Sequence, residues 1–274
     1  GVAASHEELK TIMYPRANAD DRDGHGTACA GIADAVTENR KGIPSFNVGG
    51  RYLQVQSFPA LATGAGEADD VANAIWDAVE SGAAVINLSF GAKGTAPKVV
   101  ARAVQAAVER DVIVVAAAGN DGQAARGQWP ANLPGVVVVG ATDGKLRAGF
   151  SNGTGGLARA LSAPGAGICV PGPEGYRKSS GTSLAAPLVS GVLGTMRALC
   201  PRLGAAEAVE ILRESGEDRT IQGLGPELRP TAALELLLRR QAACVNANIE
   251  RIYDENYWEN LRQQQLYREP AYNP

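Results

Sequence analysis

Uninterrupted runs of apolar and β-branched residues are the feature that most restricts the fold of this chain. The clearest runs cover residues 84–89, 112–117 and 136–139, and a fourth β-rich stretch covers 52–56. Alternating strands have one face in water, whereas continuous apolar runs are typical of strands that are covered on both faces. We therefore expect four buried strands at the centre of the molecule.

Amphipathic helical patterns separate these runs. Val71, Ile75 and Val79 recur at intervals of four, and Val100 and Val104 begin a second such series. This spacing puts the apolar residues of each segment on one helical face. Strands that alternate with helices predict an α/β fold of three layers, with a mostly parallel central sheet and helices on both faces. In such sheets, functional residues gather beyond the carboxyl ends of the strands.

The composition of the 274 residues excludes several classes of protein. Hydrophobic residues make up 45% and charged residues 20%, which is ordinary for a globular domain and unlike a disordered chain or a coiled coil. The formal net charge of −3 gives no basic surface for nucleic acid. No apolar run approaches the ~18 residues that span a bilayer. We expect no nucleic-acid partner and no membrane span.

The four cysteines carry little information by themselves. Cys29, Cys169, Cys200 and Cys244 are far apart in the sequence and form no C-x-x-C pair, so no zinc site is indicated. We expect four separate thiols, with Cys29 as a small core residue.

The C-terminal part of the chain differs from the rest. Every glycine lies at or before Gly225, and residues 231–244 form an amphipathic pattern that predicts a closing helix. Residues 245–274 are polar and aromatic, so we expect a main domain over 1–244 and a tail over 245–274. The tail is compatible with a helix docked on the domain, a partner-binding helix, or the start of another domain.

Three short segments combine residues that carry chemistry. The first is Asp-Gly-His-Gly-Thr around His25, the second is Ala-Ala-Gly-Asn ending at Asn120, and the third is Gly-Thr-Ser-Leu-Ala-Ala-Pro around Ser183. A serine hydroxyl is a weak nucleophile until an imidazole accepts its proton. Asn120 Nδ2 and the backbone N–H of Ser183 then supply two donors for an oxyanion. Taken singly, such residues are more often helix caps or turn residues.

The order of these segments resembles the subtilisin-like serine peptidase family, the subtilases. Ile86-Asn87-Leu88-Ser89-Phe90-Gly91, Trp129-Pro130-Ala131 and Ser162-Ala163-Pro164-Gly165 add weaker matches, and the likeness covers about residues 1–238. The resemblance implies a serine endopeptidase with an acyl-enzyme at Ser183, His25 as general base and Asn120 in the oxyanion hole. It implies a polypeptide substrate, no required cofactor, and a cis bond before Pro130.

The resemblance also assigns substrate binding to the ends of two strands. The first set would pair with an extended substrate as an added strand, and the second would form a wall of the pocket for the residue before the cleaved bond. The two sets are Ser89, Phe90 and Gly91, and Ala117, Ala118 and Gly119.

One part of the family pattern is not found within these residues. His6 and Leu9 match the segment that follows the catalytic Asp, and that Asp would stand two residues before Gly1. We expect the Asp and its strand to lie upstream, so the chain by itself should be inactive or very weak. Asp20, Asp21 and Asp23 are too close to His25 in sequence to replace it. They fit a solvated turn or a weak calcium-binding loop, which makes calcium a possible structural ion.

Two other functions use the same cleft. A catalytically dead scaffold would bind peptides without turnover, and a transpeptidase or macrocyclase would pass the acyl group to an amine instead of water. A nucleotide-binding function is disfavoured because the chain has neither G-x-G-x-x-G nor a P-loop. The family resemblance favours a secreted or extracytoplasmic location.

Overall fold

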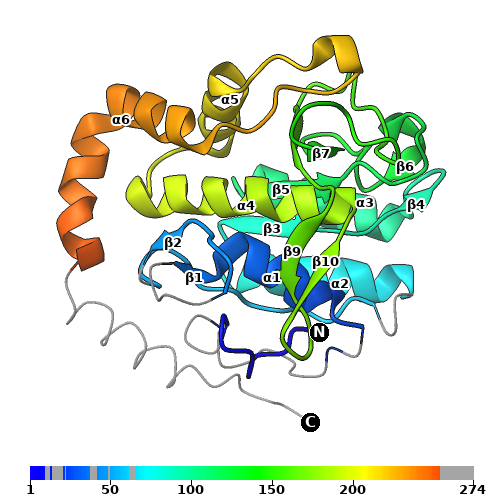
Figure 1. Ribbon diagram of the computed structural model, residues 1–274, viewed down its shortest axis with the longest axis horizontal. Helices are drawn as coiled ribbons and strands as arrows, with labels where there is room; N and C mark the ends of the chain where they lie inside the picture. The colour runs from blue at the N-terminus through cyan, green and yellow to red at the C-terminus, as the bar shows by residue number, and fades with distance from the viewer. Residues whose placement is uncertain are drawn as a thin grey trace.

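A four-stranded parallel sheet lies at the centre of the molecule (Figure 1). The computed structural model describes residues 1–9, 13, 21, 23–37, 42–48, 50–61 and 66–253. The strands are arranged in the order β3-β5-β7-β8, and each neighbouring pair is parallel. Their bounds are β3 Val85–Leu88, β5 Ile113–Ala117, β7 Val137–Thr142 and β8 Ala160–Pro164.

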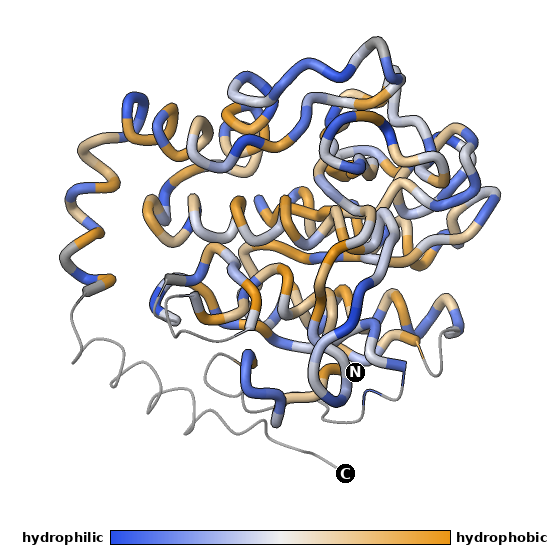
Figure 2. The backbone as a smooth tube through the Cα atoms, in the orientation of Figure 1, coloured by the Kyte–Doolittle hydropathy of each residue, from blue (hydrophilic) through white to orange (hydrophobic). Residues whose placement is uncertain are grey.

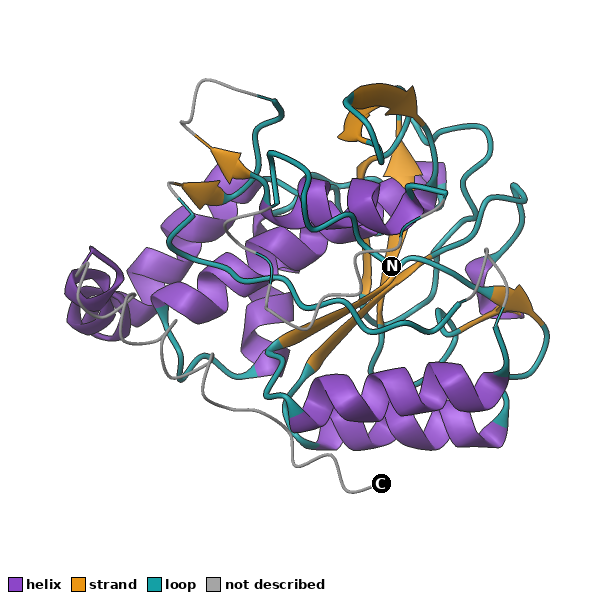
Figure 3. Ribbon diagram, turned by 90° about the horizontal axis from the view of Figure 1, so that it is seen from below, coloured by secondary structure: helices purple, strands orange, loops and turns teal. Residues whose placement is uncertain are grey.

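Helices cover both faces of this sheet, which confirms the predicted three-layer α/β fold (Figure 3). One face packs against α2 and α3, and the other against the long helix α4, with α1, α5 and α6 beyond it. The bounds are α1 His25–Asp34, α2 Ala68–Glu80, α3 Lys98–Glu109, α4 Thr182–Leu199, α5 Ala205–Ser215 and α6 Pro230–Tyr253.

The continuous apolar runs arise because β5 is buried on both sides. Ile113, Val115 and Ala117 join the core under α4, whereas Val114 and Ala116 join the core under α2 and α3. Since successive side chains point to opposite faces of a strand, neither face of β5 tolerates polar residues. Figure 2 shows the same hydrophobic character along much of α4.

Short elements complete the described structure. A parallel pair lies near the end of α1, an antiparallel pair joins the segments that follow β3 and β5, and an antiparallel hairpin precedes α4. The three pairs are β1 Val36–Thr37 with β2 Asn47–Val48, β4 Ala92–Lys93 with β6 Gln128–Trp129, and β9 Ile168–Pro171 with β10 Tyr176–Ser179. Two short 3₁₀ helices are η1 Ala125–Gly127 and η2 Thr220–Gln222. The Trp129–Pro130 bond is cis, as expected.

The prediction of a strand over residues 52–56 is wrong. Only Val55 makes a β-bridge, to Met13, and the residues around it belong to no strand. The reason is that a strand needs a neighbour to hydrogen-bond with, and the side of this segment that faces β3 borders a large cavity.

The expectation of four separate thiols is also wrong. Cys200 and Cys244 form a disulfide, with their Cα atoms 5.3 Å apart and a sequence separation of 44. Cys200 directly follows α4, and α6 packs back against α4, so the two thiols meet through tertiary packing that the sequence spacing does not reveal. Cys29 is buried and Cys169 is exposed, and both are free.

The disulfide is expected to contribute about 2–4 kcal/mol to stability, because it closes a long loop and restricts the unfolded chain. Unfolding in urea, with and without reductant, measures this contribution. The Cys200→Ala/Cys244→Ala variant should match the reduced protein, whereas Cys169→Ala should match the wild type. Equal stability of the oxidised and reduced proteins would contradict the prediction.

The closing helix is longer than the predicted 231–244. α6 continues to Tyr253 with a bend at Gln241, and Val245 is buried in the core next to Cys244. The expected boundary after residue 244 therefore falls inside a helix. The remaining tail residues, 254–274, lie outside the described residues, so their role in partner contact stays a prediction. No helix in the described parts of the chain has the length and hydropathy to cross a membrane.

Candidate active site

His25 is the first residue of α1 and is exposed to solvent. Two acidic residues hold the start of this helix: Asp23 Oδ1 accepts a hydrogen bond from the backbone N–H of His25 at 2.6 Å, and Asp21 Oδ2 accepts one from that of Thr27 at 2.7 Å. Gly24 has φ of 75°, a left-handed conformation that favours glycine. The local sequence thus begins the helix at the imidazole-bearing residue.

The acidic cluster near His25 therefore has a local structural role. Neither Asp21 nor Asp23 hydrogen-bonds the imidazole ring, and Asp20 lies outside the described residues. The described residues contain no group of three or more His, Cys, Asp and Glu side chains that are placed to hold a metal ion. Calcium binding by this loop remains a prediction.

Ser183 and Asn120 come together beside Gly181, at the start of α4. A methyl group placed on Gly181 would lie 2.9 Å from Ser183 Oγ, 3.6 Å from Asn120 Nδ2 and 3.7 Å from the backbone nitrogen of Ser183. The expected nucleophile and the two expected oxyanion donors therefore border one small volume, and a side chain at residue 181 would fill it.

Thr182 orients the Asn120 amide, a role that the sequence motifs did not reveal. Asn120 Oδ1 accepts hydrogen bonds from the backbone N–H and the hydroxyl of Thr182, both at 2.9 Å. The same hydroxyl accepts from the N–H of Gly119 at 3.1 Å. Since Oδ1 is held by these two donors, Nδ2 is directed to the other side of the amide. In the sequence, only the hydroxyl residue between Gly181 and Ser183 could have indicated this role of Thr182.

The carbonyl of Ser183 links α1, α4 and the end of β3. It accepts a hydrogen bond from Ser89 Oγ at 2.8 Å and a weaker one from Cys29 Sγ at 3.3 Å. Cys29 lies one turn after His25 on α1, so this contact packs the first turns of α1 against the start of α4 at Ser183. Burial raises the pKa of the Cys29 thiol to about 12. The thiol is therefore protonated near neutral pH, when it is a poor nucleophile.

The expected substrate-binding residues lie at the carboxyl ends of two paired strands. Ser89, Phe90 and Gly91 follow β3 directly, and Ala117, Ala118 and Gly119 end and follow β5. β3 and β5 are paired in parallel up to Leu88 and Ala116, so both sets emerge at the same edge of the sheet. Their contact with substrate remains a prediction.

The sequence and structure agree with one known family. A model of the subtilase family matches residues 3–228. The chain belongs to the subtilase family. Thermitase from Thermoactinomyces vulgaris is 37% identical over 206 residues, which cover 72% of this subtilase and 71% of thermitase. The extracellular protease of Xanthomonas campestris pv. campestris is 34% identical over 207 residues, or 69% of this chain.

Solved subtilase structures have the same fold. The patellamide maturation protease PatA aligns with a TM-score of 0.72 at 27% identity, covering 86% of this chain and 93% of PatA. A cold-adapted subtilisin-like serine proteinase aligns with the same TM-score and identity over 84% of this chain and 85% of that one. The chain spans only 35% of the Xanthomonas protein and 23% of the cell wall-associated protease of Bacillus subtilis.

A cavity of about 1610 Å³ opens beside His25 in this subtilase. One side is lined by residues 52–61 and the other by residues 83–91, and α1, α2 and α4 contribute most of the remaining lining. Within the described structure β3 hydrogen-bonds to a neighbouring strand only on the side of β5. The volume exceeds that of most small-molecule sites, which are about 300–1,000 Å³. Within the described structure, the cavity thus lies between the edge of β3 that pairs with no strand and residues 52–61, which belong to no strand.

The first residues of the chain lie at the mouth of this cavity. Gly1 packs closely on Gly26: a Cβ atom added to Gly26 would lie 1.9 Å from the carbonyl oxygen of Gly1. The backbone N–H of Ala3 donates a hydrogen bond to Thr27 Oγ1 at 2.8 Å. Within the described part of the chain, no group hydrogen-bonds the imidazole of His25, which borders the same cavity.

Proposed function

We propose that this subtilase is a serine endopeptidase that cleaves peptide bonds through an acyl-enzyme on Ser183. His25 is the general base, and the oxyanion donors are Asn120 Nδ2 and the backbone N–H of Ser183. The observation that carries the proposal is that Ser183 Oγ and both donors border one small volume beside Gly181. Donors aimed at developing negative charge give one of the largest contributions to catalysis.

The reaction proceeds by two transfers of the acyl group. His25 accepts the proton of the Ser183 hydroxyl as Oγ bonds to the substrate carbonyl carbon, and the carbonyl oxygen becomes an oxyanion. The C–N bond then breaks, and His25 returns the proton to the leaving amine. Water adds to the acyl-enzyme with His25 again as base, which releases the acid and restores the hydroxyl. No step requires a cofactor, and calcium would act only as a structural ion.

The carboxylate that orients His25 is supplied, in this proposal, by an Asp on a segment that enters the cavity and leads into Gly1. Three observations support this placement: Gly1 lies against Gly26, the cavity borders His25, and the edge of β3 on that side pairs with no strand among the described residues. The 274 residues alone should then be inactive or very weak, because the imidazole has no partner to hold its orientation.

Covalent labelling tests the proposed function. A fluorophosphonate probe is expected to label Ser183 in protein extended by the residues encoded upstream of Gly1, and labelling should be lost in His25→Ala and Ser183→Ala. The matched control is Ser180→Ala, since Ser180 is an exposed serine three positions away. Absence of labelling in a folded extended protein, or labelling that survives Ser183→Ala, would refute the proposal and favour a peptide-binding scaffold.

Asn120→Ala is expected to lower kcat by about 10²–10³-fold with little change in KM. The magnitude comes from the same substitution type in subtilisin, a member of this family. The reason is that Nδ2 interacts with the oxyanion rather than with the bound peptide. Thr182→Val should lower kcat less, because the backbone N–H of Thr182 still holds Asn120 Oδ1. Steady-state kinetics of the extended protein on a peptide substrate measures both, and an effect on KM alone would contradict the assignment.

Transfer of the acyl group to an amine is the second candidate, because an acyl-enzyme on Ser183 can be attacked by an amine as well as by water. The same residues would serve both reactions. Mass spectrometry of products, formed with and without an added peptide amine, separates them: hydrolysis yields only free carboxylates, whereas transpeptidation yields a new amide.

We place the protein outside the cytoplasm. Two relatives are named as extracellular and cell wall-associated proteases. The Cys200–Cys244 disulfide supports this location, since disulfides persist in oxidising compartments and are rare in the cytosol.

A further inference from the structure

The backbone carbonyl of Ser183 lacks the usual donor of its own helix. In an α-helix a carbonyl accepts a hydrogen bond from the N–H of the residue four positions later. That residue is Pro187, which has no N–H. The carbonyl accepts instead from Ser89 Oγ at 2.8 Å, just beyond the end of β3, and from Cys29 Sγ at 3.3 Å. The backbone of the proposed nucleophile is therefore held from outside α4.

Two further polar side chains lie behind Ser89. Asn87 Nδ2 donates to Ser89 Oγ at 2.8 Å, and Ser190 Oγ donates to Asn87 Oδ1 at 3.0 Å. Ser89 and Ser190 are 9% and 7% exposed, and Asn87 is half-buried. We call these three side chains, together with the carbonyl of Ser183 on which they end, the Ser190–Ser183 network.

The direction of every hydrogen bond in the Ser190–Ser183 network follows from its last acceptor. A carbonyl oxygen only accepts, so the Ser89 hydroxyl uses its one proton on Ser183 and has to accept from Asn87. The amide therefore directs its NH₂ group to Ser89 and its oxygen to Ser190. Successive hydrogen bonds that point the same way strengthen one another in a poorly hydrated environment. Loss of the Ser190 hydroxyl should thus weaken the contact at Ser183, seven positions earlier.

The network lies on a face of the sheet where apolar residues are the rule. Ile86 and Leu88 join the core under α2 and α3, whereas Val85 packs against the core under α4. Asn87 is on the same side of β3 as Val85, because side chains alternate along a strand. Polar groups at such a place destabilise a fold unless they are hydrogen-bonded, and apolar residues would avoid that cost. A role at the Ser183 end explains why polar residues stand there.

We propose that Ser190, Asn87 and Ser89 are positioning residues, which hold the backbone of Ser183 where the reaction needs it. The inference rests on the proposed function of Ser183. Ser183 supplies both the nucleophilic Oγ and a backbone N–H for the oxyanion, so a shift of this residue displaces both groups at once. A displacement of about 1 Å lowers a catalytic rate by on the order of 10²-fold.

Ser190 gives the most selective test, because it is the member of the network farthest from the nucleophile. In protein extended by the segment that we propose to precede Gly1, Ser190→Ala is expected to lower kcat for a chromogenic peptide by about five- to tenfold, which is the typical effect of one hydrogen bond. KM should stay within about twofold, because Ser190 does not contact the substrate in this proposal.

Thr195→Val is the matched control. Thr195 is a buried hydroxyl residue of the same helix, and its Oγ1 donates to the carbonyl four residues earlier at 2.9 Å. Ser190 Oγ makes the same kind of contact, to Ala186 at 3.1 Å. Among the described residues, Thr195 has no hydrogen bond to β3, so Thr195→Val should keep the parental kcat.

A double variant distinguishes one shared network from independent structural effects. The kcat of Ser190→Ala/Asn87→Ala should equal that of Asn87→Ala alone, because Ser190 acts on Ser183 only through Asn87. Ser190→Ala/Ser89→Ala should likewise equal Ser89→Ala, which keeps the comparison possible if Asn87→Ala does not fold. Circular dichroism confirms the fold of each variant.

Three results would overturn the inference: an unchanged kcat in folded Ser190→Ala, a change in KM alone, or losses that multiply in the double variants. Fluorophosphonate labelling of the unaltered extended protein tests the proposed function separately. Absence of labelling would refute that function, whereas labelling of Ser183 together with an unchanged kcat in Ser190→Ala would refute only the positioning role.

Discussion

Ser183→Ala and His25→Ala are each expected to lower kcat by about 10⁶-fold in protein extended by the segment that we propose to precede Gly1. The corresponding removals in subtilisin, of the same family, cost about 2 × 10⁶. The effect is large because Ser183 forms the covalent bond and His25 moves every proton in both transfers. The double variant should be no worse than either single one, since the two residues act as a unit.

Turnover of a peptide with a chromogenic leaving group measures this loss. Ser180→Ala should keep the activity of the parent, because the Ser180 hydroxyl accepts from the N–H of Gly167 and lies outside the proposed reaction. A His25→Ala variant that keeps more than about one thousandth of the parental kcat would indicate a different general base.

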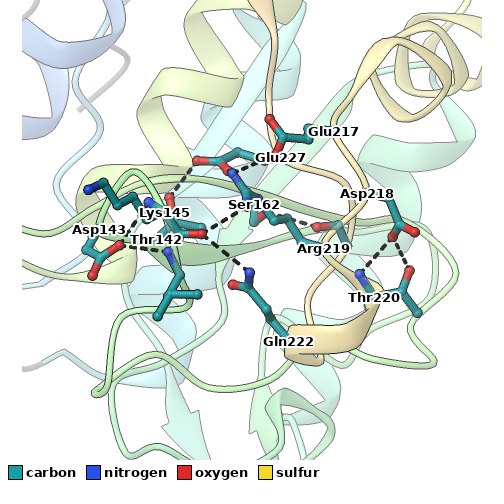
Figure 4. Close-up of polar contacts among 12 residues, drawn as sticks. Thr142, Asp143, Lys145, Ser162, Glu217, Asp218, Arg219, Thr220, Gln222 and Glu227 are labelled. Atoms are coloured by element: carbon teal, nitrogen blue, oxygen red, sulfur yellow. Dashed lines mark hydrogen bonds and ion pairs between the residues drawn. The ribbon is translucent and has the colours of Figure 1, made fainter.

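The second large effect is expected at a buried ion pair between Arg219 and Glu227 (Figure 4). Arg219 Nε donates to Glu227 Oε2 at 2.5 Å, and Thr142 Oγ1 donates to Glu227 Oε1 at 2.6 Å. Glu227 is only 7% exposed. Arg219→Met leaves this carboxylate buried without its cation, so the free energy of unfolding should fall by about 3–5 kcal/mol.

Unfolding in urea measures the change, with Glu217→Gln as the matched control. Glu217 contacts the same arginine at 3.1 Å but is 54% exposed, so its loss should cost at most about 1 kcal/mol. Arg219→Met combined with Glu227→Leu should recover stability, because an apolar pair replaces the isolated charge. If Arg219→Met and Glu217→Gln lowered the free energy of unfolding equally, burial of the Glu227 carboxylate would not be the cause of the loss.

This ion pair matters for the fold because it holds a returning segment against the sheet. The N–H of Ser162 in β8 donates to Pro226 at 2.9 Å, and Leu228 donates to the carbonyl of Ser162 at 2.7 Å. Thr142 ends β7, so the Glu227 carboxylate ties residues 226–228 to two strands. We therefore expect unfolding of Arg219→Met to begin at this edge of the sheet.

The sequence by itself determined the layers of the fold and the motifs of the site. β5 was predictable because burial on both faces leaves only apolar residues in 113–117, and helix α3 because its valines recur with the period of a helix. His25, Asn120 and Ser183 were proposed as site residues because each belongs to a short motif of contiguous residues; the structure places His25 and Ser183 at the starts of α1 and α4 and Asn120 in the loop after β5.

Only the tertiary structure decided the features that join distant segments. Examples are the Cys200–Cys244 disulfide, the Thr182 hydrogen bonds that orient Asn120, the absence of a strand over 52–56, and the hydrogen bonds that reach the carbonyl of Ser183. Periodicity and motif spacing report on neighbours along a chain. Whether a thiol, an amide, a strand edge or a carbonyl has a partner depends on residues tens of positions away, which only the packed chain brings into contact.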